Sequence, residues 1–443
     1  MSRINRRAFF RQGGLALVAL GLPPEFVTRS LLSHTRAAAR KKTLICIFQR
    51  GAVDGLNMVV PFGEKAYYER RRSIAVPAPS GRANGAIELD GFFGLHPSLQ
   101  PLHDLFARNE LAIVHAVGSP HPTRSHFDAQ DFMETATPGM KSTRDGWLNR
   151  VLTSTGCAEC EGRTLADGAA HTADHALGQT GMATSPALRG IAMGAALPIS
   201  LRGTHPALAI ADLDRFGIAG GRDASLEASF ERAYRTESGD LVSAAAGDAF
   251  DAIDILKRAN LAQYTPAAGV QYPPGEFGRS LRQIAQLIKA GVGVEIAFAD
   301  IGGWDTHQAQ GGAQGQLANR FNELARGVRA LYDDLGDRMD DVVLLTMSEF
   351  GRTVAENGSG GTDHGHANCM FVMGGGVNGG KVLGEWPGLE REQLYEGRDL
   401  ALTTDFRDVF SEIVAGHLGA ERLDNIFPGH AVDRRRWRGV VNG

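Results

Sequence analysis

The chain has 443 residues, 43% of them hydrophobic and 22% charged, which is typical of a folded protein and excludes a mostly disordered one. Its 56 glycines follow no three-residue period, which excludes collagen. Residues 1–39 contain six Arg and one Glu, so the rest of the chain carries a formal charge of −9. An acidic body argues against a general binder of nucleic acid, which needs a basic face.

The first 39 residues have the features of an export signal. Arg6 and Arg7 precede an apolar run over residues 13–22, and Ala37 begins a stretch of small residues suited to cleavage. The apolar run is about half of the ~20 residues that cross a bilayer. We therefore predict a twin-arginine signal peptide, the twin-arginine translocase as export partner, and a periplasmic or secreted protein without a stable membrane anchor. The alternative is an amphipathic N-terminal helix of the fold.

Short apolar runs rich in β-branched residues predict the buried strands of a mainly parallel sheet. They cover residues 43–48, 111–116, 292–300, 341–346 and 370–373. Between the third and fourth runs, apolar residues recur from Leu317 to Leu331 at steps of four and three, which indicates an amphipathic helix. Strand, helix and strand in this order predict an α/β fold whose central sheet is flanked by helices.

The middle of the chain, about residues 156–290, has few strand signals. Helical patterns occur there over residues 225–236, 241–263 and 279–290. We predict that this region is a helix-rich insertion or cap within a single domain spanning residues 40–443.

Two cysteines in this region form a C-x-x-C pair, Cys157 and Cys160. No second pair completes a zinc site, and the residues that follow do not read as the helix of a redox centre. A local disulfide is the favoured interpretation, and a thiol-redox protein is the weaker one. Cys46, within the first strand, is expected to be buried.

Acidic, imidazole and hydroxyl groups gather where the predicted strands end. Ligands of open parallel sheets bind beyond the carboxyl ends of the strands. These residues are Asp54 after the first strand, Arg124, Ser125 and His126 after the second, Asp305 and His307 after the third, Glu349 and Arg352 after the fourth, and Asp363, His364 and His366 before the fifth. Carboxylate and imidazole together suit a divalent transition metal, zinc above all. Such a cation polarises phosphoryl or sulfuryl oxygens.

The local spacing strengthens some of these candidates. Asp305 and His307 lie two residues apart, as do His364 and His366, so in extended segments each pair points to one side. Ser125 precedes a helical run over residues 126–135, whose N-terminal amides favour an anionic group.

Each candidate also has a purely structural alternative. Asp54 and the glycine after it are common in turns. Ser125 could be no more than the N-cap of the helix that follows it. Arg124, beside Ser125, is predicted as a second catalytic residue. Arg124 and Arg352 could clamp an anionic substrate or form structural salt bridges, and the sequence favours neither interpretation.

Three motifs carry a family resemblance: QRGAVDGLN from Gln49, GGWDTH from Gly302 and SEFGRT from Ser348. They resemble the secreted DUF1501 family, and the resemblance covers nearly the whole mature chain. Their order is similar, more distantly, to the alkaline phosphatase superfamily, which includes sulfatases, phosphodiesterases and phosphoglycerate mutases. The resemblance to DUF1501 implies no activity. The resemblance to the alkaline phosphatase superfamily implies an alkaline-phosphatase-like α/β fold.

The superfamily resemblance also implies roles for single residues. Asp54 matches an aspartate that binds one metal, and Ser125, at the end of a P-T-R-S segment, matches the nucleophile. Asp305, His307 and His364 match ligands of the second metal. Glu349 stands where the superfamily has an aspartate.

Phe350 departs from this pattern, because it stands where the superfamily has a histidine ligand. Either Asp363 or His366 replaces the missing imidazole, or the protein binds one metal ion, or the site is inactive. The leading expectation is an exported metal-dependent hydrolase of phosphate or sulfate esters, with an anionic small-molecule substrate contacted by His126 and Arg352. The alternative is a non-catalytic periplasmic binding or assembly protein.

Overall fold

A mixed, mostly parallel sheet forms the centre of the body. In the computed structural model the described residues are 41–156, 185–213, 241–259 and 261–442. β1 (Thr43–Gln49) is buried along its whole length and pairs in parallel with β8 (Ile296–Ile301) on one side and β9 (Val342–Met347) on the other. This register confirms an α/β fold with a buried, mostly parallel sheet.

The remaining strands extend this core in both directions. Beyond β9 lie β10 (Asn368–Gly374) and then β5 (Leu111–Gly118), and β10 pairs antiparallel with both β9 and β5. β11 (Lys381–Leu383) and β12 (Thr404–Asp405) pair in parallel with β5. Because β10 runs against the others, the loop before it lies at the edge where β1, β5, β8 and β9 end.

The region expected to be only a helix-rich insertion contributes two strands as well. β6 (Gly190–Met193) pairs with β8 and with β7 (Leu208–Ile210), both in parallel. These strands are four and three residues long, too short to give a readable hydrophobic pattern. β8 begins at Ile296 rather than at 292, because Gly291 and Gly293 both have positive φ angles and interrupt the extended backbone after the preceding helix.

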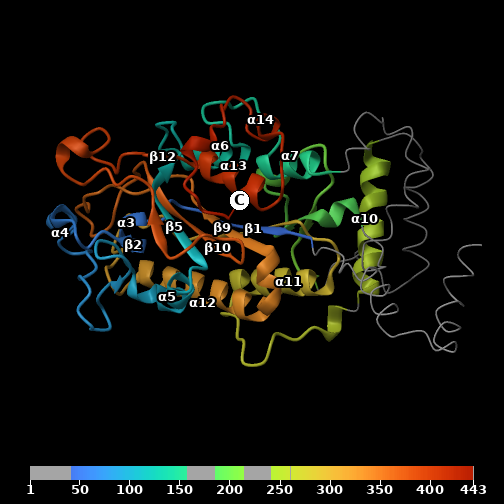
Figure 1. Cartoon of the computed structure of the whole chain (residues 1–443), viewed down its shortest axis with the longest axis horizontal. Helices are drawn as coiled ribbons and strands as arrows, with labels where there is room; N and C mark the ends of the chain where they lie inside the picture. Colours follow the sequence, from blue (N-terminus) through green and yellow to red (C-terminus); the bar gives the residue numbers. More distant parts are fainter. Residues whose placement is uncertain (1–40, 157–184, 214–240, 260, 443) are drawn as a thin grey trace, which may run out of the picture. The chain divides into compact units, whose positions relative to one another are not determined.

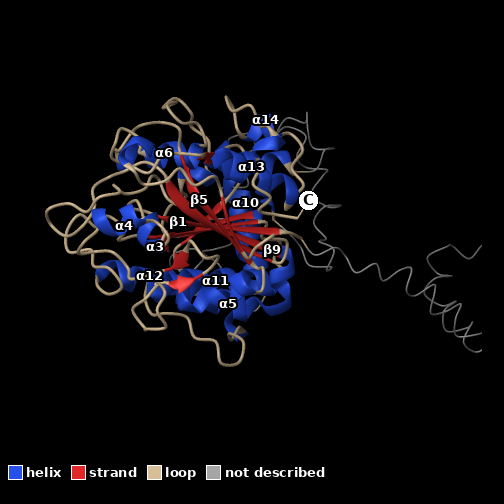
Figure 2. Cartoon of the chain, turned by 60° about the vertical axis from the view of Figure 1, so that its left-hand side comes forward, coloured by secondary structure: helices blue, strands red, loops and turns tan. Residues whose placement is uncertain are grey.

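Helices cover both faces of the sheet (Figures 1 and 2). On one face lie α5 (Gln100–Ala107), α11 (Glu276–Ala290) and α12 (Gln316–Leu335). On the other lie α7 (Trp147–Ser154), α13 (Phe406–Gly416) and α14 (Leu423–Ile426). β1 contributes side chains to both layers of the core: Ile45 and Ile47 pack on the α5, α11 and α12 side, and Cys46 packs on the α7, α13 and α14 side. Cys46 is buried, as expected.

Further elements complete the described part of the chain. They are the helices α3 (Gly55–Met58), α4 (Lys65–Arg70), α6 (His126–Thr135) and α10 (Leu241–Arg258), the strands β2 (Val59–Val60), β3 (Ile87–Glu88) and β4 (Gly94–Leu95), and 3-10 turns at Pro97–Leu99, Pro186–Arg189, Ile199–Leu201, Leu261–Gln263, Gly336–Asp341, Arg391–Gln393 and Arg434–Arg436. No helix among the described residues is both long and apolar enough to traverse a bilayer. The predicted signal peptide, the helix over 225–236 and the Cys157–Cys160 pair lie outside the described residues.

Candidate metal centre

Three loops at one edge of the sheet bring four side chains together: His126 at the start of α6, Asp305 and His307 after β8, and His364 before β10. We call these four residues the His/Asp cluster. The Nε2 atom of His364 lies 2.9 Å from His126 Nε2, 3.0 Å from His307 Nε2 and 3.2 Å from Asp305 Oδ1. His307 Nε2 also lies 3.0 Å from Asp305 Oδ1. Segments more than 200 residues apart in sequence thus meet at one point.

The outer nitrogens of two imidazoles are held by carboxylates. His126 Nδ1 lies 2.8 Å from Glu349 Oε1, and His307 Nδ1 lies 3.0 Å from Asp363 Oδ1. An ionised carboxylate only accepts hydrogen bonds, so each Nδ1 donates. In the neutral imidazole the proton is then on Nδ1, and Nε2 directs a lone pair into the cluster.

The third imidazole is held in the same way by the backbone. His364 Nδ1 lies 2.9 Å from the carbonyl oxygen of Arg124, which can only accept. Carboxylates and carbonyls at the outer nitrogen are the usual partners of metal-bound histidines, because they fix the tautomer and the ring orientation.

Three lone pairs and one carboxylate oxygen that face each other repel unless a positive charge lies between them. Zn–N distances of ~2.0–2.1 Å in a tetrahedral site separate the ligand atoms by about 3.3 Å. The observed separations of 2.9–3.2 Å are close to this value. Ligand atoms of His126, Asp305 and His364 lie within 4.8 Å of one another, and the arrangement suits one divalent cation.

The charges around the cluster are set by hydrogen bonds as well as by burial. Burial raises the pKa of Asp305, but the hydrogen bond and charge of Arg352, together with His364 and His307, outweigh this and lower the pKa to about 2. The hydrogen bond that His126 donates to Glu349 raises the pKa of His126, whereas burial lowers the pKa of His364. Asp305 is therefore charged at neutral pH and available as an anionic ligand.

Arg352 fixes the position of Asp305 and of the loops next to the cluster. Its guanidinium donates at 2.6 Å to Asp305 Oδ1. Its other donors bond the backbone carbonyls of Gly51, Ala52, Trp304 and Thr362. The side chain is fully buried, so these contacts give it a positioning role rather than the predicted role in substrate binding.

Arg124 and His366 lie to the side of the cluster. The Arg124 guanidinium bonds Asp399 and Glu396, each at 2.6 Å. The His366 ring stacks on Tyr395 with 4.3 Å between centroids. The predicted catalytic role of Arg124 and the predicted ligand role of His366 gain no support from these contacts.

Asp54 is built into the core instead of the cluster. The residue is 0% exposed, and its Oδ2 accepts from Arg71 Nη1 and Gln310 Nε2, each at 2.6 Å. Its Oδ1 has no hydrogen-bond partner among the described residues. The structure thus does not bring Asp54 to the other predicted metal ligands.

Glu349 reaches the cluster only through His126. Its Oε1 accepts from His126, from Gln130 Nε2 at 2.8 Å and from the Gly51 backbone at 2.9 Å. Burial raises the pKa of Glu349, but these hydrogen bonds together lower it. Glu349 and Asp363, both predicted as ligands, therefore orient histidines.

Ser125 and Phe350 border the cluster. Ser125 is exposed and occupies the N-cap position of α6, yet its side chain makes no capping hydrogen bond. Phe350 is buried, and its ring centroid lies 4.9 Å from that of His126 and 5.0 Å from that of His364. Phe350 thus forms an apolar wall behind two imidazoles.

Of the residues predicted as metal ligands, the structure brings together Asp305, His307 and His364. His126, predicted only as a substrate contact, joins them as a potential ligand. The available signal was its place at a strand end beside Ser125. In the loop after β1, Gly51 packs directly against the loop that carries Asp305. Its φ is +117°, and a Cβ atom at this position would lie 2.8 Å from the backbone nitrogen of Asp305.

The fold and the cluster define an α/β protein with a candidate metal centre at the carboxyl edge of its sheet. The sequence over residues 41–424 matches the family described as protein of unknown function DUF1501, and the chain belongs to this family. No curated protein matches the chain.

Proposed function

We propose that the protein is a metal-dependent hydrolase of phosphate or sulfate esters that binds one divalent cation, zinc above all, with Ser125 as nucleophile. The observation that carries the proposal is the convergence of three Nε2 atoms and Asp305 Oδ1. Each imidazole is fixed in the orientation that metal binding requires. A site of this kind, on a protein exported by the twin-arginine route, would act in the periplasm or outside the cell.

The cation would polarise the phosphoryl or sulfuryl oxygen and lower the pKa of a coordinated hydroxyl. The chain's own contribution begins with Ser125, next to the potential ligand His126 at the start of the ten-residue helix α6. The first N–H groups of a helix lack intrahelical partners and attract anions. An anionic ester placed here has its phosphorus or sulfur near Ser125 Oγ.

Two displacements then complete the hydrolysis. Ser125 Oγ forms a bond to the phosphorus or sulfur as the bond to the ester oxygen breaks, and the alcohol leaves with a proton. Water then breaks the serine ester and releases phosphate or sulfate. Arg352 keeps Asp305 charged and fixed throughout, because its five hydrogen bonds hold it in the loops behind the cluster.

One cation fits the residues better than the two that the phosphatase resemblance implies. Asp54 is neutralised by Arg71, and Glu349 is engaged by His126, Gln130 and Gly51. We also propose that the fold is alkaline-phosphatase-like. This is supported by the loops after β1, β5, β8 and β9, which all lie at the edge of the sheet where the His/Asp cluster forms.

The test is metal analysis together with hydrolysis of p-nitrophenyl phosphate and p-nitrophenyl sulfate. We expect about one divalent ion per chain, lost in His364→Ala and kept in His103→Ala, whose histidine lies on α5 away from the cluster. Ser125→Ala is expected to keep the metal and lose the turnover, while Ser80→Ala, at another exposed serine, keeps both. Metal-free wild-type protein without Ser125-dependent turnover would overturn the proposal.

A non-catalytic binding or assembly protein is the second candidate. The observation that favours it is that Arg124 and Arg352, the predicted substrate clamps, are both engaged by protein groups. Its mark would be partner binding that survives the change Ser125→Ala, with no turnover of either ester in the wild type.

A further inference from the structure

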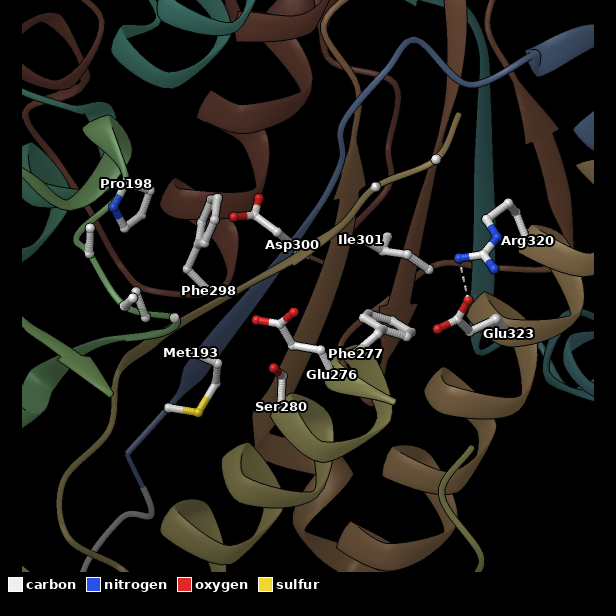
Figure 3. Close-up of a pocket in the computed structure, with 16 residues that line it drawn as sticks. Met193, Pro198, Glu276, Phe277, Ser280, Phe298, Asp300, Ile301, Arg320 and Glu323 are labelled. Atoms are coloured by element: carbon white, nitrogen blue, oxygen red, sulfur yellow. Dashed lines mark ion pairs between the residues drawn. The ribbon is translucent and has the colours of Figure 1, made fainter. Parts of the chain in front are cut away.

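A cavity of about 660 Å³ lies beyond the carboxyl ends of β6 and β8 (Figure 3). Its walls come from these strand ends, from the first turn of α11 and from α12. None of the four residues of the His/Asp cluster lines it. The volume is in the range of small-molecule sites, and the place is where ligands of parallel α/β sheets bind.

The cavity carries more negative than positive charge. Glu276 of α11 and Asp300 of β8 both direct their carboxylates into it (Figure 3). Arg50 bonds Asp300 at 2.6 Å but also the buried Glu134 at 2.9 Å, so one positive charge serves two carboxylates. Together with Glu276, these three carboxylates and one guanidinium carry a formal charge of −2.

The second charged pair in the wall is neutral overall. Arg320 of α12 is bonded by Glu323 at 2.7 Å. This pairing disfavours an anionic ligand, since the guanidinium is already neutralised. The N-terminus of α11 could also attract an anion, but the Glu276 carboxylate already lies in its first turn.

The pKa of Asp300 is raised by burial first and by the neighbouring carboxylates in addition. Burial raises the pKa of Asp300 to about 6, and the charges of Glu134 and Glu276 add to this rise while Arg50 opposes it. A ligand cation between Glu276 and Asp300 would relieve the repulsion.

The rest of the wall suits an organic cation rather than a bare metal ion. The rings of Phe277 and Phe298 and the thioether of Met193 supply apolar surface. Ser280 is 7% exposed, lines the cavity, and its hydroxyl has no hydrogen-bond partner within the described part of the chain. Aromatic faces and carboxylates together are the groups that bind alkylammonium ions.

We propose that this cavity binds an organic ammonium group and, resting on the proposed function, that the ester substrate carries such a group. Gly303 lines the cavity and lies two residues before Asp305, so their Cα atoms are within roughly 7 Å. Gly303 thus joins the cavity wall to the loop that carries Asp305, and an aminoalkyl phosphate is the class of substrate that has an ammonium group for the cavity and an ester for the cluster.

The first experiment measures binding alone, by calorimetry on the mature metal-loaded protein. The probes are choline and its uncharged isostere 3,3-dimethylbutan-1-ol. We expect choline to bind at least about tenfold more tightly, and Glu276→Gln to remove about tenfold of that preference. Glu392→Gln, at an exposed glutamate elsewhere, is the matched control and should change nothing. Equal binding of the two probes, or no effect of Glu276→Gln, would overturn the ammonium site.

The second experiment separates this inference from the proposed function. It compares kcat/KM for phosphocholine and 3,3-dimethylbutyl phosphate, with an expected preference of about tenfold that Glu276→Gln abolishes. His307→Ala should stop both reactions and leave choline binding intact. Choline binding without turnover of either ester would support the cavity site and refute the hydrolase. Turnover of both esters at equal rates would refute the substrate class and leave the hydrolase standing.

Discussion

The change Asp54→Asn separates a core residue from a metal ligand. The Asp54–Arg71 pair is buried, with side-chain exposures of 1% and 0%. Breaking such a pair leaves an uncompensated guanidinium and costs about 3–5 kcal/mol. The body from Lys41 to Gly443 has about 400 residues, so at ~2.1 cal/mol/K per residue its unfolding entropy is about 0.85 kcal/mol/K. A loss of about 4 kcal/mol then lowers Tm by about 5 °C.

The assay pairs a thermal melt with metal analysis of the same sample. We expect Asp54→Asn to lower Tm by this amount while the metal content stays that of the wild type. Arg71→Met should cost a similar amount, and the double variant less than the sum, because neither charge is then stranded. An unchanged Tm with lost metal would show that Asp54 is a ligand and would refute the assignment to the core.

Three further changes test other parts of the account. Asp363→Asn, at an exposed carboxylate that orients His307, should weaken metal affinity about 10–100-fold without changing the Tm of metal-free protein, as competition with a chelator would show. Phe350→His should leave the metal content near one ion per chain, because Asp54 and Glu349 are engaged elsewhere; a second ion would contradict this. Burial lowers the pKa of His115 to about 4, so the unfolded chain binds more protons between pH 6.5 and 4. Stability is then complete above pH 6.5 and falls by about 3 kcal/mol towards pH 4, and urea titrations of His115→Gln should show a shallower fall, an equal slope being the contrary result.

The sequence predicts well what depends on local pattern. The apolar run that begins at Thr43 forms a strand because its β-branched and apolar residues are buried on both faces of the sheet. The helix marked by Leu317 and Leu331 forms because one apolar stripe packs on that sheet. The meeting of Asp305, His307 and His364 follows from the general rule that strand ends converge.

The sequence predicts poorly what depends on partners distant in the chain. Asp54 follows a strand as a ligand would, but Arg71 and Gln310 turn its carboxylate into the core. Glu349 has the chemistry of a ligand, and only the position of His126 makes it an orienting group. β6 and β7 are too short to give a readable pattern, although they form one end of the sheet and β6 also lines the cavity.

X-ray absorption at the metal edge tests the central claim most directly. Protein loaded with one equivalent of zinc should show about three nitrogen ligands of imidazole type and at least one oxygen, at roughly 2.0–2.1 Å. His126→Ala and His307→Ala should each remove one imidazole contribution, and His364→Ala should abolish zinc binding. A spectrum with sulfur ligands, or one that none of these three changes alters, would contradict a cation held between the histidines and Asp305.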